Sequence, residues 1–141
     1  MAIHFYSADV PVPLRNRRKL KFFIQDLIGQ EGCQSGQLSY IFCSDAFLLN
    51  INQQFLKHNT YTDIITFPFS NPGEPITAEI YISVDRVKEN ARNFKAKESE
   101  ELHRVVFHGT LHLCGYKDKT SIQKQLMREM ENKYLLAYSV Q

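Results

Sequence analysis

The spacing of apolar and polar residues predicts strands and helices along most of the chain. Four short segments carry the alternating or two-faced apolar pattern of β-strands, and they cover residues 3–6, 36–43, 62–69 and 79–84. Five segments repeat apolar residues at helical spacing, and they cover residues 14–28, 44–56, 85–94, 99–113 and 121–134. Their order is strand, helix, strand, helix, strand, strand, helix, helix, helix. This order predicts an α+β fold, with a small mixed sheet of about four strands packed with about five helices.

The composition of the strands predicts where each lies in the sheet. The run 3–6 is short enough for an edge strand, whereas 36–43 is apolar on both faces and therefore central. Pro68 marks the end or the exposed edge of the third strand. The short loop at 71–75 predicts that the third and fourth strands form a hairpin, and residues 57–61 form a polar loop before it.

Capping residues and apolar faces refine the predicted helices. Gly29 is predicted to end the first helix, and residues that cap helix N-termini begin three others, namely Ser44 or Asp45, Asp85, and Thr120 with Gln123. The faces predicted to turn inward hold Phe47, Ile51 and Phe55; Val87, Ala91 and Phe94; Leu102, Val105, Val106, Gly109 and Leu113; and Ile122, Leu126, Met130 and Tyr134.

Composition places the chain among ordinary globular proteins. Its 141 residues are 43% hydrophobic and 23% charged, with a net charge of +2, and the length predicts a single domain over residues 1–141. Three cysteines without a Cys-x-x-Cys pair argue against a disulfide framework and indicate a reducing compartment. Since no apolar run reaches the length of a membrane span and no signal layout begins the chain, we expect a cytoplasmic protein without membrane contact.

The densest positive cluster lies early in the first predicted helix and comprises Arg15, Arg17, Arg18, Lys19 and Lys21. Basic residues at a helix N-terminus oppose the helix dipole, which favours a use for them beyond solubility. Two interpretations remain open: a solvated helix face, or a surface that contacts nucleic-acid phosphates.

A metal-binding pattern follows at residues 108–118. His108 and His112 are four residues apart, so both imidazoles lie on one face of a helix. Gly115 can end that helix in the left-handed conformation, and the chain can then return to bring Asp118 to the same ion. Three protein ligands leave one position for water, as in catalytic zinc sites. We therefore predict a Zn²⁺ site made by His108, His112 and Asp118.

Other interpretations of these residues remain open. The histidines could be core residues whose nitrogens are satisfied by carbonyl groups, and Asp118 could cap the last helix. The spacing is also that of zinc proteases, but those carry Glu directly after the first histidine, where this chain has Gly109. The motif thus retains the metal ligands of a protease but lacks its general base.

Three sequence segments resemble the YbeY family of metal-dependent endoribonucleases, and the resemblance covers roughly residues 38–134. The motif His-Gly-x-Leu-His-Leu-x-Gly-Tyr covers 108–116, the segment Thr-Asp-Ile-Ile-Thr-Phe-Pro covers 62–68, and Ala-Glu-Ile-Tyr-Ile-Ser covers 78–83. Two positions differ from the family pattern: Asp118 replaces a third histidine, and Leu56 replaces an arginine. Replacing histidine by aspartate adds negative charge and makes harder ions more acceptable.

The resemblance implies a single-strand endoribonuclease that matures small-subunit ribosomal RNA and acts in ribosome quality control. Its partners would be ribosomal RNA and the small subunit. The metal would polarise a phosphoryl oxygen, activate a bound water, or both; no side chain of the motif is an obvious base, so metal-bound water and a ribose 2′-hydroxyl both remain open as the attacking group. The resemblance also suggests that the site lies in a groove between residues 62–68 and the helix carrying Asn52. The candidates for substrate contacts are Asn52, Lys57, Thr62, Arg15, Arg17 and Arg18. The alternatives are a ribosome-assembly or RNA-binding factor with a structural metal and, less favoured, a metalloprotease.

Overall fold

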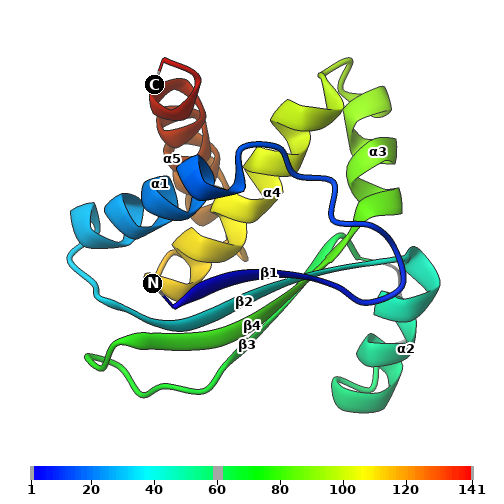
Figure 1. Cartoon of the computed structure of the whole chain (residues 1–141), viewed down its shortest axis with the longest axis horizontal. Helices are drawn as coiled ribbons and strands as arrows, with labels where there is room; N and C mark the ends of the chain where they lie inside the picture. The colour runs from blue at the N-terminus through cyan, green and yellow to red at the C-terminus, as the bar shows by residue number, and fades with distance from the viewer. Residues whose placement is uncertain (1, 59–61, 141) are drawn as a thin grey trace.

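The computed structural model describes residues 2–58 and 62–140. Within these ranges the elements follow the predicted order (Figure 1): β1 (Ile3–Ser7), α1 (Arg17–Gln30), β2 (Ser35–Cys43), α2 (Asp45–Phe55), β3 (Ile64–Pro68), β4 (Ile76–Ser83), α3 (Val84–Asn93), α4 (Glu98–Leu113) and α5 (Ser121–Ser139). The α+β prediction is confirmed. None of the helices in the described ranges combines the length and apolar character needed to span a bilayer.

The four strands form one mixed sheet in the order β1-β2-β4-β3. β1 pairs with β2 and β2 with β4 in parallel, whereas β3 and β4 form an antiparallel hairpin. The predicted edge position of β1, central position of β2 and hairpin are therefore confirmed. β3 is the opposite edge strand, and Pro68 is its last residue, where its missing N–H costs no ladder hydrogen bond.

The sheet has two unlike faces. On one face, α1, α4 and α5 cover the main core, which includes Tyr40, Phe107 and Tyr134 at 0–1% exposure. On the other face, α2 packs its Leu48 and Ile51 against Ile65 of β3. Because successive side chains of a strand point to opposite faces, β3 contributes to both layers.

The first helix does not end at Gly29 as predicted. It continues to Gln30, and Gly32, with a φ of 79°, ends it. The amide of Gly32 donates to the carbonyl of Gly29 and that of Cys33 to the carbonyl of Ile28, which is the Schellman arrangement of helix ends. The stop therefore needs the glycine with positive φ, and Gly29 remains helical.

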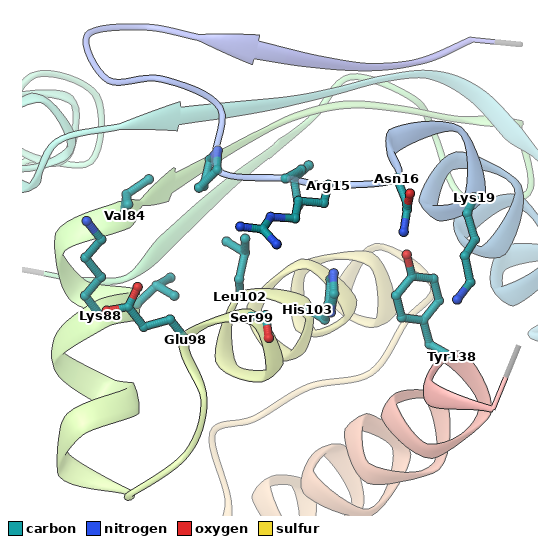
Figure 2. A pocket seen from close by; sticks show the side chains of 13 residues that line it. Arg15, Asn16, Lys19, Val84, Lys88, Glu98, Ser99, Leu102, His103 and Tyr138 are labelled. Atoms are coloured by element: carbon teal, nitrogen blue, oxygen red, sulfur yellow. The ribbon is translucent and has the colours of Figure 1, made fainter.

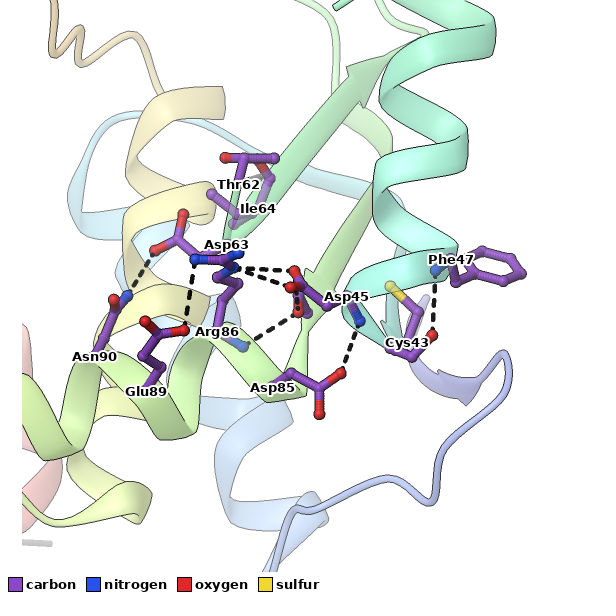
Figure 3. A network of polar contacts seen from close by, with 12 residues as sticks. Cys43, Asp45, Phe47, Thr62, Asp63, Ile64, Asp85, Arg86, Glu89 and Asn90 are labelled. Atoms are coloured by element: carbon purple, nitrogen blue, oxygen red, sulfur yellow. Dashed lines mark hydrogen bonds and ion pairs between the residues drawn. The ribbon is translucent and has the colours of Figure 1, made fainter. Parts of the chain in front are cut away.

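The predicted caps at Ser44 and Thr120 are confirmed, and the one at Asp85 is wrong. Ser44 accepts from the amide of Phe47, and Thr120 forms the full capping box. α3 is instead capped by Ser83. The Asp85 carboxylate accepts from the amide of Asp45 at 2.8 Å (Figure 3), so it serves the N-terminus of α2 rather than that of its own helix.

Several inward faces are rotated from those predicted. In α2, Phe47 and Phe55 are exposed, and the buried residues are Leu48, Ile51 and Asn52. In α3, Phe94 lies past the helix end and is exposed. In α4, Leu111 is fully buried and Leu113 only in part. In α5, Ile122 and Leu126 are exposed, and the buried residues are Met127, Glu131, Tyr134 and Tyr138. A helical repeat fits two neighbouring stripes of residues on the helix surface, and the element packed against the helix selects between them.

Of the loop predicted at 57–61, Lys57 is exposed and 59–61 lie outside the described residues.

Candidate active site

The helix that carries the two histidines lies unusually close to the sheet. A Cβ atom placed on Gly109 of α4 would lie 2.7 Å from Cδ1 of Ile64 and 3.2 Å from Cγ2 of Ile80, closer than carbon atoms normally approach. Gly109 therefore brings His108 and His112 against β3. The glutamate that zinc proteases carry at this position would require these isoleucine side chains to shift.

His108 is held between two carboxylates. Its Nδ1 lies 2.7 Å from Oε2 of Glu131, and its Nε2 lies 3.2 Å from Oδ2 of Asp118. Glu131 in turn accepts from Nη1 of Arg104 at 3.1 Å. In the neutral ring with Nδ1–H donating to Glu131, Nε2 carries the lone pair on the side of Asp118. The fixed ring orientation is that of a metal-ligating histidine whose second nitrogen is held by a carboxylate.

The charges around His108 shift two pKa values in opposite directions. Burial alone lowers the pKa of His108, but the hydrogen bond and charge of Glu131, and then the charge of Asp118, raise it above the ordinary 6.5. Burial alone raises the pKa of Glu131, and the His108 and Arg104 contacts bring it below the ordinary 4.5. The two groups therefore stabilise one another's charged forms.

The turn after α4 brings Asp118 beside His108. Gly115 has a φ of 111° and ends the helix, with its amide donating to the carbonyl of His112. The carbonyl of Tyr116 then accepts from Nδ1 of His112 at 3.0 Å, which leaves Nε2 of His112 with its lone pair. The Asp118 carboxylate faces His108, and Thr120, not Asp118, caps α5.

A cavity of about 210 Å³ contains His108, His112 and Asp118. The start of β3 forms its other wall, with Thr62, Asp63, Ile64 and Thr66. Asp63 accepts from Nδ2 of Asn90 at 3.3 Å (Figure 3), and burial raises the pKa of its carboxyl above the ordinary 3.8. The Asp63 carboxyl thus keeps its proton to a higher pH than an exposed aspartate does.

The donor set fits a divalent ion in its chemistry. Two imidazoles, each with Nδ1 bound to an oxygen, and one carboxylate share the cavity, and nitrogen and oxygen donors of this kind bind Zn²⁺ and similar ions. In the described parts of the chain, no three His, Cys, Asp or Glu side chains are already gathered as an ion cage. Holding an ion would therefore require the side chains to draw closer together.

A second cavity, of about 650 Å³, shares Asp63, His108 and Asp118 with the first. Arg104, Lys124 and Arg128 line it together with His108 and Asp118. Arg104 and Arg128 both pair with Glu131, at 3.1 and 3.5 Å, and the side chain of Arg128 is half exposed. Three basic side chains of α4 and α5 therefore lie beside His108, in a lining that also holds the carboxylates of Asp63, Glu101, Asp118 and Glu131.

Of the six substrate-contact candidates, only Thr62 lines the cavity shared by His108 and His112. Asn52 is buried in α2, which packs on the face of the sheet opposite α4. Lys57 is exposed after the end of α2, with a φ of 55°. Arg15 lines a separate cavity, and Arg17 and Arg18 are exposed. The cavity is bounded by β3, as predicted, but by α4 and the turn to Asp118 rather than by α2.

The fold and the site define a class: a small α+β protein in which one helix holds two histidines against the edge strand of a mixed sheet. The family model described as endoribonuclease YbeY matches residues 3–139. Curated proteins named endoribonuclease YbeY are similar to the chain. One from Parabacteroides distasonis is 42% identical over 96% of this chain and 94% of its own, and one from Cytophaga hutchinsonii is 45% identical over 92% and 91%.

A solved structure agrees with this similarity. The solution structure of a Thermotoga maritima protein matches with a TM-score of 0.67 and 28% identity, over 96% of this chain and 88% of that one. The family match and the curated relatives extend over nearly the whole chain. The chain belongs to the YbeY endoribonuclease family.

Proposed function

We propose that the chain is a metal-dependent endoribonuclease that cleaves single-stranded RNA and matures small-subunit ribosomal RNA. The observation that carries the proposal is the arrangement of His108, whose ring is fixed by Glu131 so that Nε2 faces Asp118 in a cavity shared with His112 and Asp63. Family membership supplies the reaction class. Residues 1–141 would act as one catalytic domain with ribosomal RNA and the small subunit as partners.

His108, His112 and Asp118 would hold one divalent ion, and Zn²⁺ suits two imidazoles and a carboxylate best. When bound, such an ion polarises a phosphoryl oxygen and makes an attacking hydroxyl more acidic. The hydrogen bonds that prepare the protein for it are present: Glu131 fixes one imidazole and the carbonyl of Tyr116 the other. Hydrogen bonds of this kind typically raise metal affinity about 10- to 100-fold.

Asp63 would move the proton. Its carboxyl lies in the same cavity, is positioned by Asn90, and has a raised pKa because it is buried. As a carboxylate it accepts the proton of the attacking hydroxyl, and as an acid it donates to the leaving oxygen. This assigns a general base that the histidine motif itself lacks.

The cationic groups of the larger cavity would hold the RNA backbone. Lys124 and Arg128 lie in one cavity with His108 and Asp118, so a phosphate held there lies next to the reacting one. In the sequence, Leu56 stands where the family has arginine. Because leucine cannot bind phosphate, the positive charge of α5 would take over that task.

The absence of the family arginine also favours a second candidate, an assembly or RNA-binding factor in which the metal is structural. A metalloprotease is disfavoured because Gly109 stands where its glutamate is required, and a side chain there would have to displace those of Ile64 and Ile80.

Incubation of the protein with end-labelled 16S rRNA fragments, with Zn²⁺ or with a chelator, tests the proposal. We expect cleavage products that the chelator abolishes, and a loss of about 100-fold or more in rate for Asp63→Asn, with zinc content unchanged by elemental analysis. Asp26→Asn, an exposed carboxylate on α1, is the matched control. RNA binding without cleavage at any metal concentration would favour the assembly factor, and equal rates for Asp63→Asn and Asp26→Asn would remove the assignment of Asp63.

A further inference from the structure

A third cavity, of about 520 Å³, lies on another side of α4 from the active site (Figure 2). His103 of α4 lines it, and His103 lies five positions before His108, an offset that turns it by about 140° around the helix axis. The cavity opens between the start of α1, the start of α4, α3 and the end of α5. Among the described residues it shares no lining side chain with the two cavities at His108.

Positive charge dominates the lining. The lining holds three basic side chains, Arg15, Lys19 and Lys88, and one carboxylate, that of Glu98. Figure 2 shows the Arg15 guanidinium and the His103 ring extending into the cavity, with Lys19 on the side of α1 and Lys88 on the side of α3. Within residues 2–58 and 62–140, neither Arg15 nor Lys88 forms an ion pair or hydrogen bond, so both remain available to an anion.

The floor of the same cavity is apolar and aromatic. Leu14, Val87 and Leu102 are buried there. The Tyr138 ring stands edge-on to His103 with centroids 4.8 Å apart, and the Lys19 ammonium lies 4.5 Å from the centre of that Tyr138 ring. A volume of this size matches sites for small organic ligands, which combine apolar walls with a few fixed polar groups. An inorganic anion would leave the apolar part unused.

The lowered pKa of His103 agrees with an electropositive cavity. Burial, and then the charge of Lys19, lower the pKa of this imidazole below the ordinary 6.5. The other charged or titratable groups that line the cavity are Arg15, Lys88, Glu98 and Tyr138. A bound phosphate would oppose the effect of Lys19, and the neutral ring supplies one N–H donor to it.

We propose that this cavity binds one nucleotide unit, with Arg15 and Lys88 on the phosphate and the nucleoside against Leu102 and Tyr138. The shared chemistry has two possible sources: a free nucleoside monophosphate, or one nucleotide of an RNA strand bound along the protein. Only the second source rests on the proposed function. In that case the cavity is an RNA contact remote from the cleavage site.

Calorimetric titration of chelator-treated protein tests the proposal without any cleavage. The ligands are 5′-AMP, inorganic phosphate and a 2′-O-methyl RNA decamer. The variant is Arg15→Ala with Lys88→Ala, and the matched control, Arg92→Ala with Lys95→Ala, removes two exposed charges outside the cavity. Each lost charge-assisted contact weakens binding by about tenfold or more, so the variant should lose about 100-fold in affinity for its ligand and the control less than about twofold.

The outcomes separate the sources. Binding of AMP that the Arg15/Lys88 variant weakens identifies a free nucleotide. Decamer binding weakened by the same variant, without measurable AMP binding, identifies RNA. The proposal is overturned if the Arg15/Lys88 variant binds AMP and the decamer as the control does, or if inorganic phosphate binds as tightly as AMP, because the apolar floor would then contribute nothing. Since the chelated protein cannot use a metal, failure of the nuclease assay does not affect this result.

Discussion

The carboxylate of Glu131 should contribute more to the unfolding free energy than any surface charge, and the substitution Glu131→Gln measures this contribution. The substitution keeps the shape of the side chain but removes its charge. Glu131 accepts from His108 and from Arg104, and its side chain is only 7% exposed. Gln has one oxygen and one amide group, so one of the two N–H donors would face another donor. Hydrogen bonds to charged groups contribute about 1.5–3 kcal/mol each, and breaking a buried pair costs about 3–5 kcal/mol.

The pH dependence of this loss has a definite sign. The pKa of His108 is raised above 6.5, so its contribution to stability is complete below pH 6.5 and is lost as pH rises through the folded value. The pKa of Glu131 is lowered below 4.5, so its contribution is complete above pH 4.5 and is lost as pH falls. The difference in unfolding free energy between wild type and Glu131→Gln should therefore be largest between pH 4.5 and pH 6.5. As pH rises through the folded pKa of His108, this difference should shrink to the part due to Arg104.

Urea unfolding of chelator-treated protein from pH 4 to pH 9 measures this difference. Glu129→Gln, an exposed position on the same helix, is the matched control and should change the unfolding free energy by less than about 0.5 kcal/mol. A Glu131→Gln loss that is the same at pH 5.5 and pH 9 would show that His108 and Glu131 are not coupled as the geometry indicates.

Two further predictions concern packing and RNA binding. Gly109→Ala should lower the unfolding free energy by about 1–3 kcal/mol, because its Cβ meets Ile64. Gly29→Ala, with open space around the new methyl group, should raise the unfolding free energy by about 0.5–1 kcal/mol. Equal melting temperatures of the two variants would contradict the close approach of α4 to β3. Replacing Lys124 and Arg128 together by Ala should flatten the slope of log RNA affinity against log salt by about 1.4 units, since each single-strand contact contributes about 0.7. Salt titration of Arg17→Ala with Arg18→Ala in parallel tests the first-helix interpretation; a change in that pair alone would place the phosphates on α1.

Local signals in the sequence were sufficient for most of the fold. Alternation and apolar content predicted the strands, the edge position of β1, the central position of β2 and the β3–β4 hairpin. The capping box at Thr120 needs only four consecutive residues, so it too could be read directly. The turn at Gly115 is equally local, because one glycine both ends α4 and returns the chain towards His108.

Features that depend on distant partners could not be predicted in the same way. Asp85 caps the neighbouring helix rather than its own, and no local pattern records that contact. The inward face of α5 was assigned one stripe away from the observed one, and Glu131 was missed as a result. The spacing of Met127, Glu131, Tyr134 and Tyr138 is itself helical, so a glutamate within an otherwise apolar stripe was the available signal. Asn52 was expected beside the histidines, but the alternation of β3 places α2 on the other face.

The crowding at Gly109 also bears on how this motif can change over time. In sequence, the zinc-protease pattern is one substitution away, because only the residue after His108 differs at the general-base position. In space, that substitution would have to place a carboxylate side chain where even one methyl group meets Ile64 and Ile80. Acquiring the glutamate would require the Ile64 and Ile80 side chains to repack between α4 and the sheet, next to Thr62 and Asp63 of the cavity. The two patterns are thus neighbours in sequence, but they are separated in space by a repacking of the side chains beneath the histidines.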